Sequence, residues 1–295
     1  MTGSFRIGSV AGIDLRIHYT WLFALVLVSW SLADGFFPAS FPSFDPITDW
    51  LLGIVSALLL FASVLIHELS HSVMAMKRGL AVHSITLFIF GGVSAIAGEP
   101  RAAKDEFAIS VVGPLTSLAL SACFWGLGLA LGTSDTPAAA VTLYLAFINL
   151  ALGIFNLVPG FPLDGGRVLR SVLWGATHNF RRATQIATYV GQAFGFLLIG
   201  WGLFQLLSGD FLGGMWTAFL GWFLNSAAEA TRHTELMTPR SLTSVPAETT
   251  LSSALRDLAD QDIYEIWVTE DGHVVGLLTR PRNGAYHGHR APSRA

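Results

Sequence analysis

The sequence predicts a mainly α-helical, polytopic membrane protein of about six transmembrane helices, with a membrane-associated β-hairpin and a small cytoplasmic α/β unit. Of its 295 residues, 52% are hydrophobic and 13% are charged, whereas about a quarter of an average soluble domain is charged. The apolar residues form long runs, and several exceed the roughly 20 residues that a helix needs to cross a bilayer. The net charge of −3 provides no basic surface, so we expect the lipid bilayer and no nucleic acid as a partner.

The hydropathy pattern places the membrane helices at about 19–36, 50–78, 105–132, 138–158, 184–208 and 211–231. Residues 5–19 alternate between apolar and polar positions, which predicts a strand. Residues 82–98 are rich in β-branched and aromatic side chains and are interrupted by Gly91 and Gly92, which predicts a hairpin or a bent strand pair. Because an open strand edge cannot face lipid, this hairpin must be covered by protein, line a cavity or lie at the interface.

The basic residues gather in the connections on one side of these helices. The connections on the other side, at 34–49, 132–137 and 208–210, contain acidic residues but no Lys or Arg. The positive-inside rule therefore predicts a protein of the cell membrane with both termini in the cytoplasm. The basic residues that carry this prediction are Arg6, Arg16, Lys77, Arg78, Arg101, Lys104, Arg167, Arg170, Arg181 and Arg182.

The composition divides the chain into three regions. Residues 1–232 form the membrane-embedded region, and residues 233–281 have a soluble pattern with a predicted helix at 251–261 and strands at 265–270 and 273–279. Residues 282–295 contain few apolar side chains and are expected to be disordered.

The second predicted helix carries the sequence HELSH, in which His67 and His71 are four residues apart. At about 100° per residue, the two imidazoles lie about 40° apart on one helix face and can bind one metal ion. Glu68 lies beside the first histidine, where its carboxylate can take a proton from water without binding the metal. A charged side chain at mid-bilayer costs roughly 2.5 to 3.5 kcal/mol, and zinc binding can offset several such costs.

A catalytic zinc ion usually has three protein ligands, so one more residue is required. Asp164 is the candidate, because it follows a segment in which Pro159 and Pro162 must end a membrane helix. Irregular backbone at membrane depth is tolerated where it lines a protein cavity. The alternative is that Asp164 only caps a helix at 166–177.

Two motifs resemble those of the site-2 protease family of intramembrane metallopeptidases. They are HELSH at 67–71 and NLVPGFPLDGG at 156–166, and the similar region extends over roughly residues 10–230, including VVGPLTS at 111–117. The resemblance implies hydrolysis of a peptide bond in a partner's membrane helix near the cytoplasmic face. It places the Zn²⁺ ligands on His67, His71 and Asp164, the general base on Glu68 and the transition-state donor on Asn156.

A helix hides its peptide carbonyls, so a substrate segment must unwind, and an edge of the hairpin can hold it as an added strand. We expect Gly91, Gly92 and Pro162 to lie beside that segment. The alternative for the two glycines is a simple tight turn. The alternative for Asn156 is an amide that satisfies backbone carbonyls freed by the following prolines.

Residues 235–279 resemble a CBS domain, a module that normally occurs in pairs and binds adenine nucleotides. The chain has one copy, and Arg282 stands where many of these motifs have Asp. The resemblance thus leaves open a nucleotide sensor or a homodimerisation module without a ligand.

Two other functions use the same residues. A CBS-regulated membrane metal transporter would use His67, Glu68, His71 and Asp164 as a transit site, and a non-catalytic binding scaffold would use the same fold without turnover. Transit requires weak binding, whereas three ligands arranged for tight zinc binding favour an enzyme.

Overall fold

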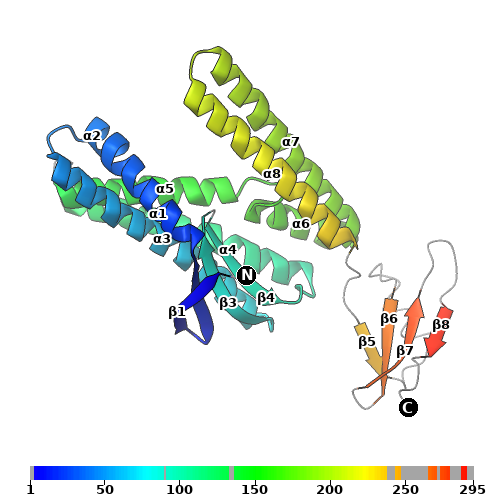
Figure 1. Cartoon of the computed structure of the whole chain (residues 1–295). Coiled ribbons are helices and arrows are strands. Elements are labelled where there is room, and N and C mark those ends of the chain that lie inside the picture. The colour runs from blue at the N-terminus through cyan, green and yellow to red at the C-terminus, as the bar shows by residue number, and fades with distance from the viewer. Residues whose placement is uncertain are drawn as a thin grey trace. The chain divides into compact units, whose positions relative to one another are not determined.

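Figure 1 shows the computed structural model of the chain, which describes residues 3–89, 91–132 and 136–237 and four later strands. From residue 232 onward, the backbone alone is described. The chain forms two compact units. The first comprises Met1–Val158 with Leu163–Val168, and the second comprises Pro159–Pro162 with Leu169–Ala295.

The first unit contains a four-stranded sheet with the strand order β1-β2-β3-β4. Strands β1 and β2 are antiparallel, β2 and β3 are parallel, and β3 and β4 are antiparallel. The single strand predicted at 5–19 is a hairpin instead, because Ala11 and Gly12 have φ angles of 53° and 82°, which reverse the chain. The hairpin predicted at 82–98 is confirmed. The strands are β1 Ser4–Val10, β2 Ile13–His18, β3 Ala81–Phe88 and β4 Gly91–Ala97.

The helices follow the hydropathy pattern closely. In the described part of the chain, five helical stretches are long and apolar enough to cross a membrane, at Thr20–Ser40, Pro46–Lys77, Ala103–Ala130, Pro137–Asn156 and Phe180–Leu207. The first consists of α1 Thr20–Ser31, the π-helical η1 Leu32–Phe36 and α2 Phe37–Ser40, and the others are α3, α4, α5 and α7. The sixth expected helix is present as α8 Phe211–Met237, but it is not among these five stretches, so its crossing stays a prediction.

Helix α3 begins at Pro46, four residues before the start at about residue 50 that the hydropathy pattern predicts. The Asp45 carboxylate accepts hydrogen bonds from the backbone N–H groups of Ile47 and Thr48, at 3.0 and 3.2 Å, and Pro46 occupies the first helical position. The hydrogen bonds from Thr48, through its hydroxyl and its backbone N–H, lower the pKa of Asp45. This cap fixes the start of the helix that carries HELSH.

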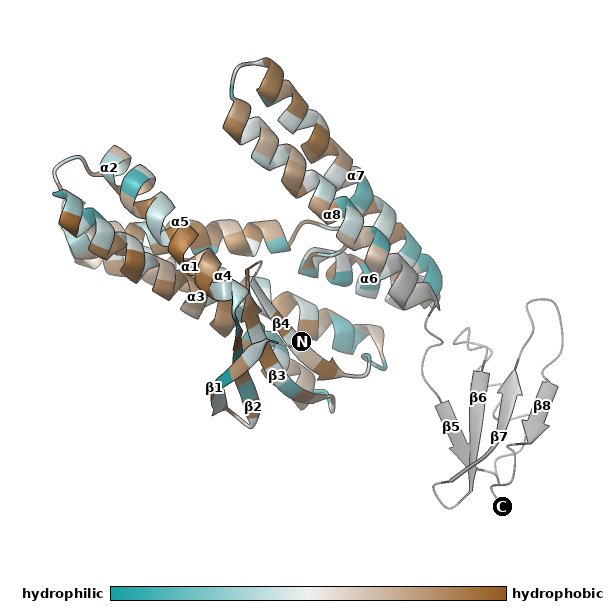
Figure 2. Ribbon diagram, in the orientation of Figure 1, coloured by the Kyte–Doolittle hydropathy of each residue, from teal (hydrophilic) through white to brown (hydrophobic). Residues whose placement is uncertain are grey.

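Much of the ribbon of the long helices is brown in Figure 2, the colour of hydrophobic residues. Large side chains such as Val26, Trp125 and Leu197 are 66%, 57% and 71% exposed. Large apolar side chains exposed along helices long enough to cross a membrane match the hydrocarbon of a bilayer. The protein is therefore a multi-pass membrane protein.

Two apolar clusters position the elements of the first unit. One joins the N-terminal halves of α3 and α5 and includes Leu52, Val141 and Leu145. The other packs the sheet against α3 and α4 and includes Ile85, Ala75 and Ile109. The sheet thus lies against the C-terminal half of α3, which carries His67 and His71.

The second unit contains a helical hairpin of α7 Phe180–Leu207 and α8, and part of α6 Asp164–Thr177. Its helices approach closely at Gly195 and Gly221, where a Cβ atom on either glycine would meet the backbone of the other helix. The buried Arg170 guanidinium lies over the rings of Phe161 and Phe180, at 4.9 and 4.6 Å from their centroids.

A second sheet, with the order β5-β6-β7-β8, lies in the C-terminal region. Its strands are β5 Thr243–Pro246, β6 Glu265–Glu270, β7 His273–Thr279 and β8 His287–Arg290. The strands predicted at 265–270 and 273–279 are confirmed, and the helix predicted at 251–261 lies outside the described residues. Strand β8 lies within residues 282–295, which we expected to be disordered. Its backbone pairs in antiparallel with that of β7.

Candidate metal centre

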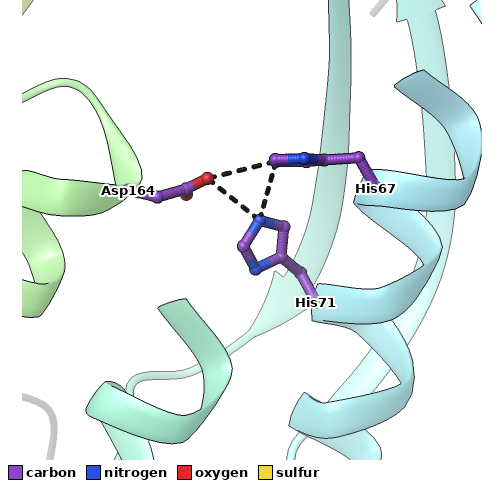
Figure 3. Close-up of side chains that lie close together, drawn as sticks. All are labelled: His67, His71 and Asp164. Carbon is purple, nitrogen blue, oxygen red and sulfur yellow. Dashed lines mark hydrogen bonds and ion pairs between the residues drawn. The ribbon is translucent and has the colours of Figure 1, made fainter. Parts of the chain in front are cut away.

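Helix α3 brings His67 and His71 to one face, and the start of α6 brings Asp164 against them (Figure 3). The two Nε2 atoms are 3.2 Å apart, and each lies 3.1 Å from Oδ2 of Asp164. The histidines are 4% and 7% exposed. The predicted convergence of the i and i+4 imidazoles is therefore observed, and residues 93 and 97 positions apart in sequence meet at one point.

The spacing of these three atoms fits a zinc ion. Bonds of about 2.0 to 2.1 Å in tetrahedral geometry place neighbouring ligand atoms about 3.3 to 3.4 Å apart. The observed separations of 3.1 and 3.2 Å are close to this value. Among the described residues, His67, His71 and Asp164 form the group of His, Cys, Asp and Glu side chains that gathers in this way.

Hydrogen bonds on the far side of each ring orient the metal-facing atoms. Nδ1 of His71 lies 2.6 Å from the carbonyl oxygen of Ile109. Because a carbonyl oxygen only accepts, Nδ1 donates, and the neutral ring presents a lone pair on Nε2. Nδ1 of His67 lies 2.8 Å from Oγ of Ser117, which can accept in the same way. Two imidazole lone pairs and a carboxylate then face one another, and a cation between them removes their repulsion.

Helix α4 packs directly against the two rings at Gly113. A Cβ atom at this position would overlap the Nε2 atoms of both His67 and His71. Gly113 and Ser117 are four residues apart on one face of α4, and both lie in the segment 111–117 that resembles the site-2 protease family. We did not assign a role to either residue from the sequence, although the Gly-to-Ser spacing in an apolar helix is a usable signal.

Asp164 is the first residue of α6. A Cβ atom on the next residue, Gly165, would overlap the backbone carbonyl groups of Leu157 and Val158, which explains the glycine after the aspartate. One turn further, Nε of Arg167 lies 3.8 Å from Oε1 of Glu106, which is fully buried on α4. This ion pair links the start of α6 to α4.

Strand β4 holds the side chain of Glu68. Oε2 of Glu68 accepts a hydrogen bond of 3.0 Å from the hydroxyl of Ser94, which accepts one of 3.1 Å from Ser72. A Cβ atom at Gly92 would overlap Cγ of Glu68, so this glycine is required by close approach. Gly91 has no atom near its Cβ position and a φ angle of 128°, which agrees with the turn alternative.

Comparison with known proteins bears on the identity of this centre. Residues 55–139 and 132–198 match the model of peptidase family M50. Rip3 of Mycobacterium tuberculosis, which its name describes as a candidate zinc metalloprotease, is 42% identical over 230 residues, or 77% of this chain and 58% of that protein. The chain belongs to peptidase family M50.

Two matches from Methanocaldococcus jannaschii, one by sequence and one by structure, are also similar to this chain. A zinc metalloprotease of this organism is 31% identical over 70% of the chain and 56% of its own length. The solved structure of its site-2 protease superposes with a TM-score of 0.52 at 28% identity, over 78% of this chain and 95% of that chain. The chain thus spans little more than half the length of Rip3 and of the archaeal metalloprotease.

Two of the predicted site residues, Asn156 and Pro162, are not joined to the centre by a described contact. Asn156 is the last residue of α5, and its Nδ2 donates to the backbone oxygen of Leu152 at 3.0 Å. This bond lies within α5 and does not involve a carbonyl that Pro159 or Pro162 leaves without its helical partner. The second N–H of the amide is available to a substrate, so the oxyanion role and its structural alternative both stay predictions. Pro162 is exposed and belongs to the second unit, so its place beside the substrate also stays a prediction.

Proposed function

We propose that the chain is an intramembrane zinc metalloprotease, which hydrolyses peptide bonds within or near the transmembrane segments of other membrane proteins. The observation that carries the proposal is the group of three electron-pair donors from His67, His71 and Asp164, 3.1 to 3.2 Å apart, with Glu68 beside them on α3. The names of Rip3 and of the archaeal metalloprotease support this assignment.

When bound by these three residues, zinc would polarise the scissile carbonyl and make water a better nucleophile. The Glu68 carboxylate, held by Ser94, accepts a proton from the attacking water and returns it to the leaving amine. Asn156 donates a hydrogen bond to the oxygen that becomes negatively charged.

The unwound substrate pairs along β4, which is an edge strand of the first sheet. Gly92 and Ser94 of β4 both contact Glu68, so a peptide on this strand passes the general base. Pro162 lies beside the same peptide in this proposal.

We propose that both termini and the β3-β4 hairpin are cytoplasmic, since the basic residues flank these segments. Cysteines placed at Ser43 and Ser252 in a Cys123→Ser background should react with an impermeant reagent from opposite faces of the membrane. Reaction of both positions from outside intact cells would contradict this topology.

The terminal region 233–281 is a single CBS-like unit in this proposal, which forms homodimers or binds an adenine nucleotide and takes no part in catalysis.

The proposed reaction is tested with the purified protein in liposomes and a peptide that contains one membrane helix. Cleavage should stop when a chelator removes the metal and return when zinc is added, with no zinc flux across the liposome. Flux without cleavage would identify a transporter, and the absence of both would identify a scaffold.

A chain ended after Arg232 should still cleave, because the terminal region holds none of the proposed site residues.

A further inference from the structure

Asn149 is a fully buried amide on α5, 0% exposed, that bonds to another membrane helix. Its Nδ2 donates to Oγ of Ser63 on α3 at 3.2 Å and to the backbone oxygen of Leu145 at 2.8 Å. Ser63 is 2% exposed, and its hydroxyl donates to the backbone oxygen of Leu59 at 3.0 Å. A hydrogen bond therefore joins α3 and α5 in the middle of the apolar region.

The two helices run in the same direction. Their N-terminal halves share the cluster that includes Leu52 of α3 and Val141 of α5, and further along each helix Ser63 meets Asn149. The bond between Ser63 and Asn149 thus marks one level from which positions on both helices can be measured.

From this level, Asn156 lies at a distance along α5 that falls between the distances of His67 and His71 along α3. His67 and His71 are four and eight residues after Ser63, or about 6 and 12 Å along α3. Asn156 is seven residues after Asn149, or about 10.5 Å along α5, and two turns place it on the same helix face. The register set by Asn149 therefore brings Asn156 to the depth of the two imidazoles.

We propose that Asn149 is a positioning residue, whose bond to Ser63 fixes α5 along α3 and holds Asn156 level with the metal ligands. The inference rests on the proposed function, because Asn156 acts on a bound peptide in that proposal. Apolar helix faces can slide past one another at low cost, and one buried asparagine fixes the register of such pairs, as it does in coiled coils.

The unpaired part of the amide supports this role. Oδ1 of Asn149 is buried and has no hydrogen-bond partner among the described side chains and backbone groups. A buried acceptor without a partner lowers stability, and replacing both polar partners by apolar groups of similar shape is often neutral or stabilising. Stability alone therefore does not account for the asparagine, whereas a fixed register does.

The test is the double variant Asn149→Leu with Ser63→Ala, measured in liposomes with the membrane-helix peptide. We expect kcat to fall about 10- to 100-fold, since a displacement of about 1 Å can cost a factor of 10². Zinc content, KM and the thermal midpoint should stay near their wild-type values. Thr142→Val is the matched control, because this buried hydroxyl of α5 donates to the backbone oxygens of Ala138 and Ala139 in its own helix, and it should keep the wild-type rate.

A thermodynamic cycle with Asn156→Ala separates positioning from general damage. If Asn149 acts through Asn156, the Asn149→Leu change should cost little further rate in the Asn156→Ala background. The inference is overturned if the rate losses of Asn149→Leu and Asn156→Ala multiply when the two changes are combined. It is also overturned if the double variant Asn149→Leu with Ser63→Ala keeps the wild-type rate. If the Asn149→Leu protein does not fold, the cleavage rate of the Ser63→Ala variant decides the question. This change removes only the oxygen atom that accepts the hydrogen bond from Asn149. The Glu68→Gln variant distinguishes the two proposals. A Glu68→Gln protein that cleaves like the wild type refutes the proposed function. An inactive Glu68→Gln protein, together with an Asn149→Leu protein of wild-type rate, refutes only the positioning role of Asn149.

Discussion

Replacing His67 by alanine should reduce the zinc content of the purified protein from about one ion per chain to nearly none and abolish peptide cleavage. His67 supplies one of the three converging atoms, and its loss leaves His71 and Asp164 without a third ligand. Metal analysis of the folded variant measures the effect. His83→Ala is the matched control, because this exposed histidine of β3 lies outside the group, and it should keep the metal.

The Glu68→Gln variant separates metal binding from catalysis in the same experiment. Glutamine has the shape of glutamate and can still bond to Ser94, but it cannot accept the proton from water. We expect normal zinc content and no measurable cleavage. Undiminished zinc in His67→Ala would refute the ligand assignment, and an active Glu68→Gln protein would refute the assigned base.

The sequence predicted those parts of the centre that depend on local geometry. The positions of His67 and His71 follow from helical periodicity within one turn, and the helix was recognisable from its apolar length. Asp164 was recognisable because the preceding prolines end a membrane helix next to a carboxylate. These features need no knowledge of how distant segments pack.

The parts that the sequence did not predict depend on packing between distant segments. Ile109 holds His71 through its backbone carbonyl, which any residue type would provide. Ser94 reaches Glu68 because β3 pairs in parallel with β2 and places β4 against α3, and this pairing joins residues about 70 positions apart. The level of α5 along α3 is likewise a tertiary property, and the bond between Asn149 and Ser63 defines it.

The role of Asn156 is the second prediction with a large expected effect. If its amide donates to the negatively charged oxygen of the tetrahedral intermediate, Asn156→Ala should lower kcat by about 10² to 10³, or roughly 2.7 to 4 kcal/mol of transition-state stabilisation. KM and zinc content should change little, since Asn156 is not one of the three converging ligands. Single-turnover cleavage measured beside metal analysis gives both quantities.

The alternative role of Asn156 predicts a different result. In the structure its Nδ2 bonds to the carbonyl oxygen of Leu152 one turn earlier, and an amide with this role alone would contribute to stability at the end of α5. The matched control is Asn179→Ala, which removes the amide that accepts from the Arg182 backbone N–H at 2.8 Å at the start of α7. That change should lower stability by about 1 kcal/mol and leave kcat unchanged. A variant at Asn156 that behaves like Asn179→Ala would support the structural role, and a wild-type rate would end the oxyanion proposal.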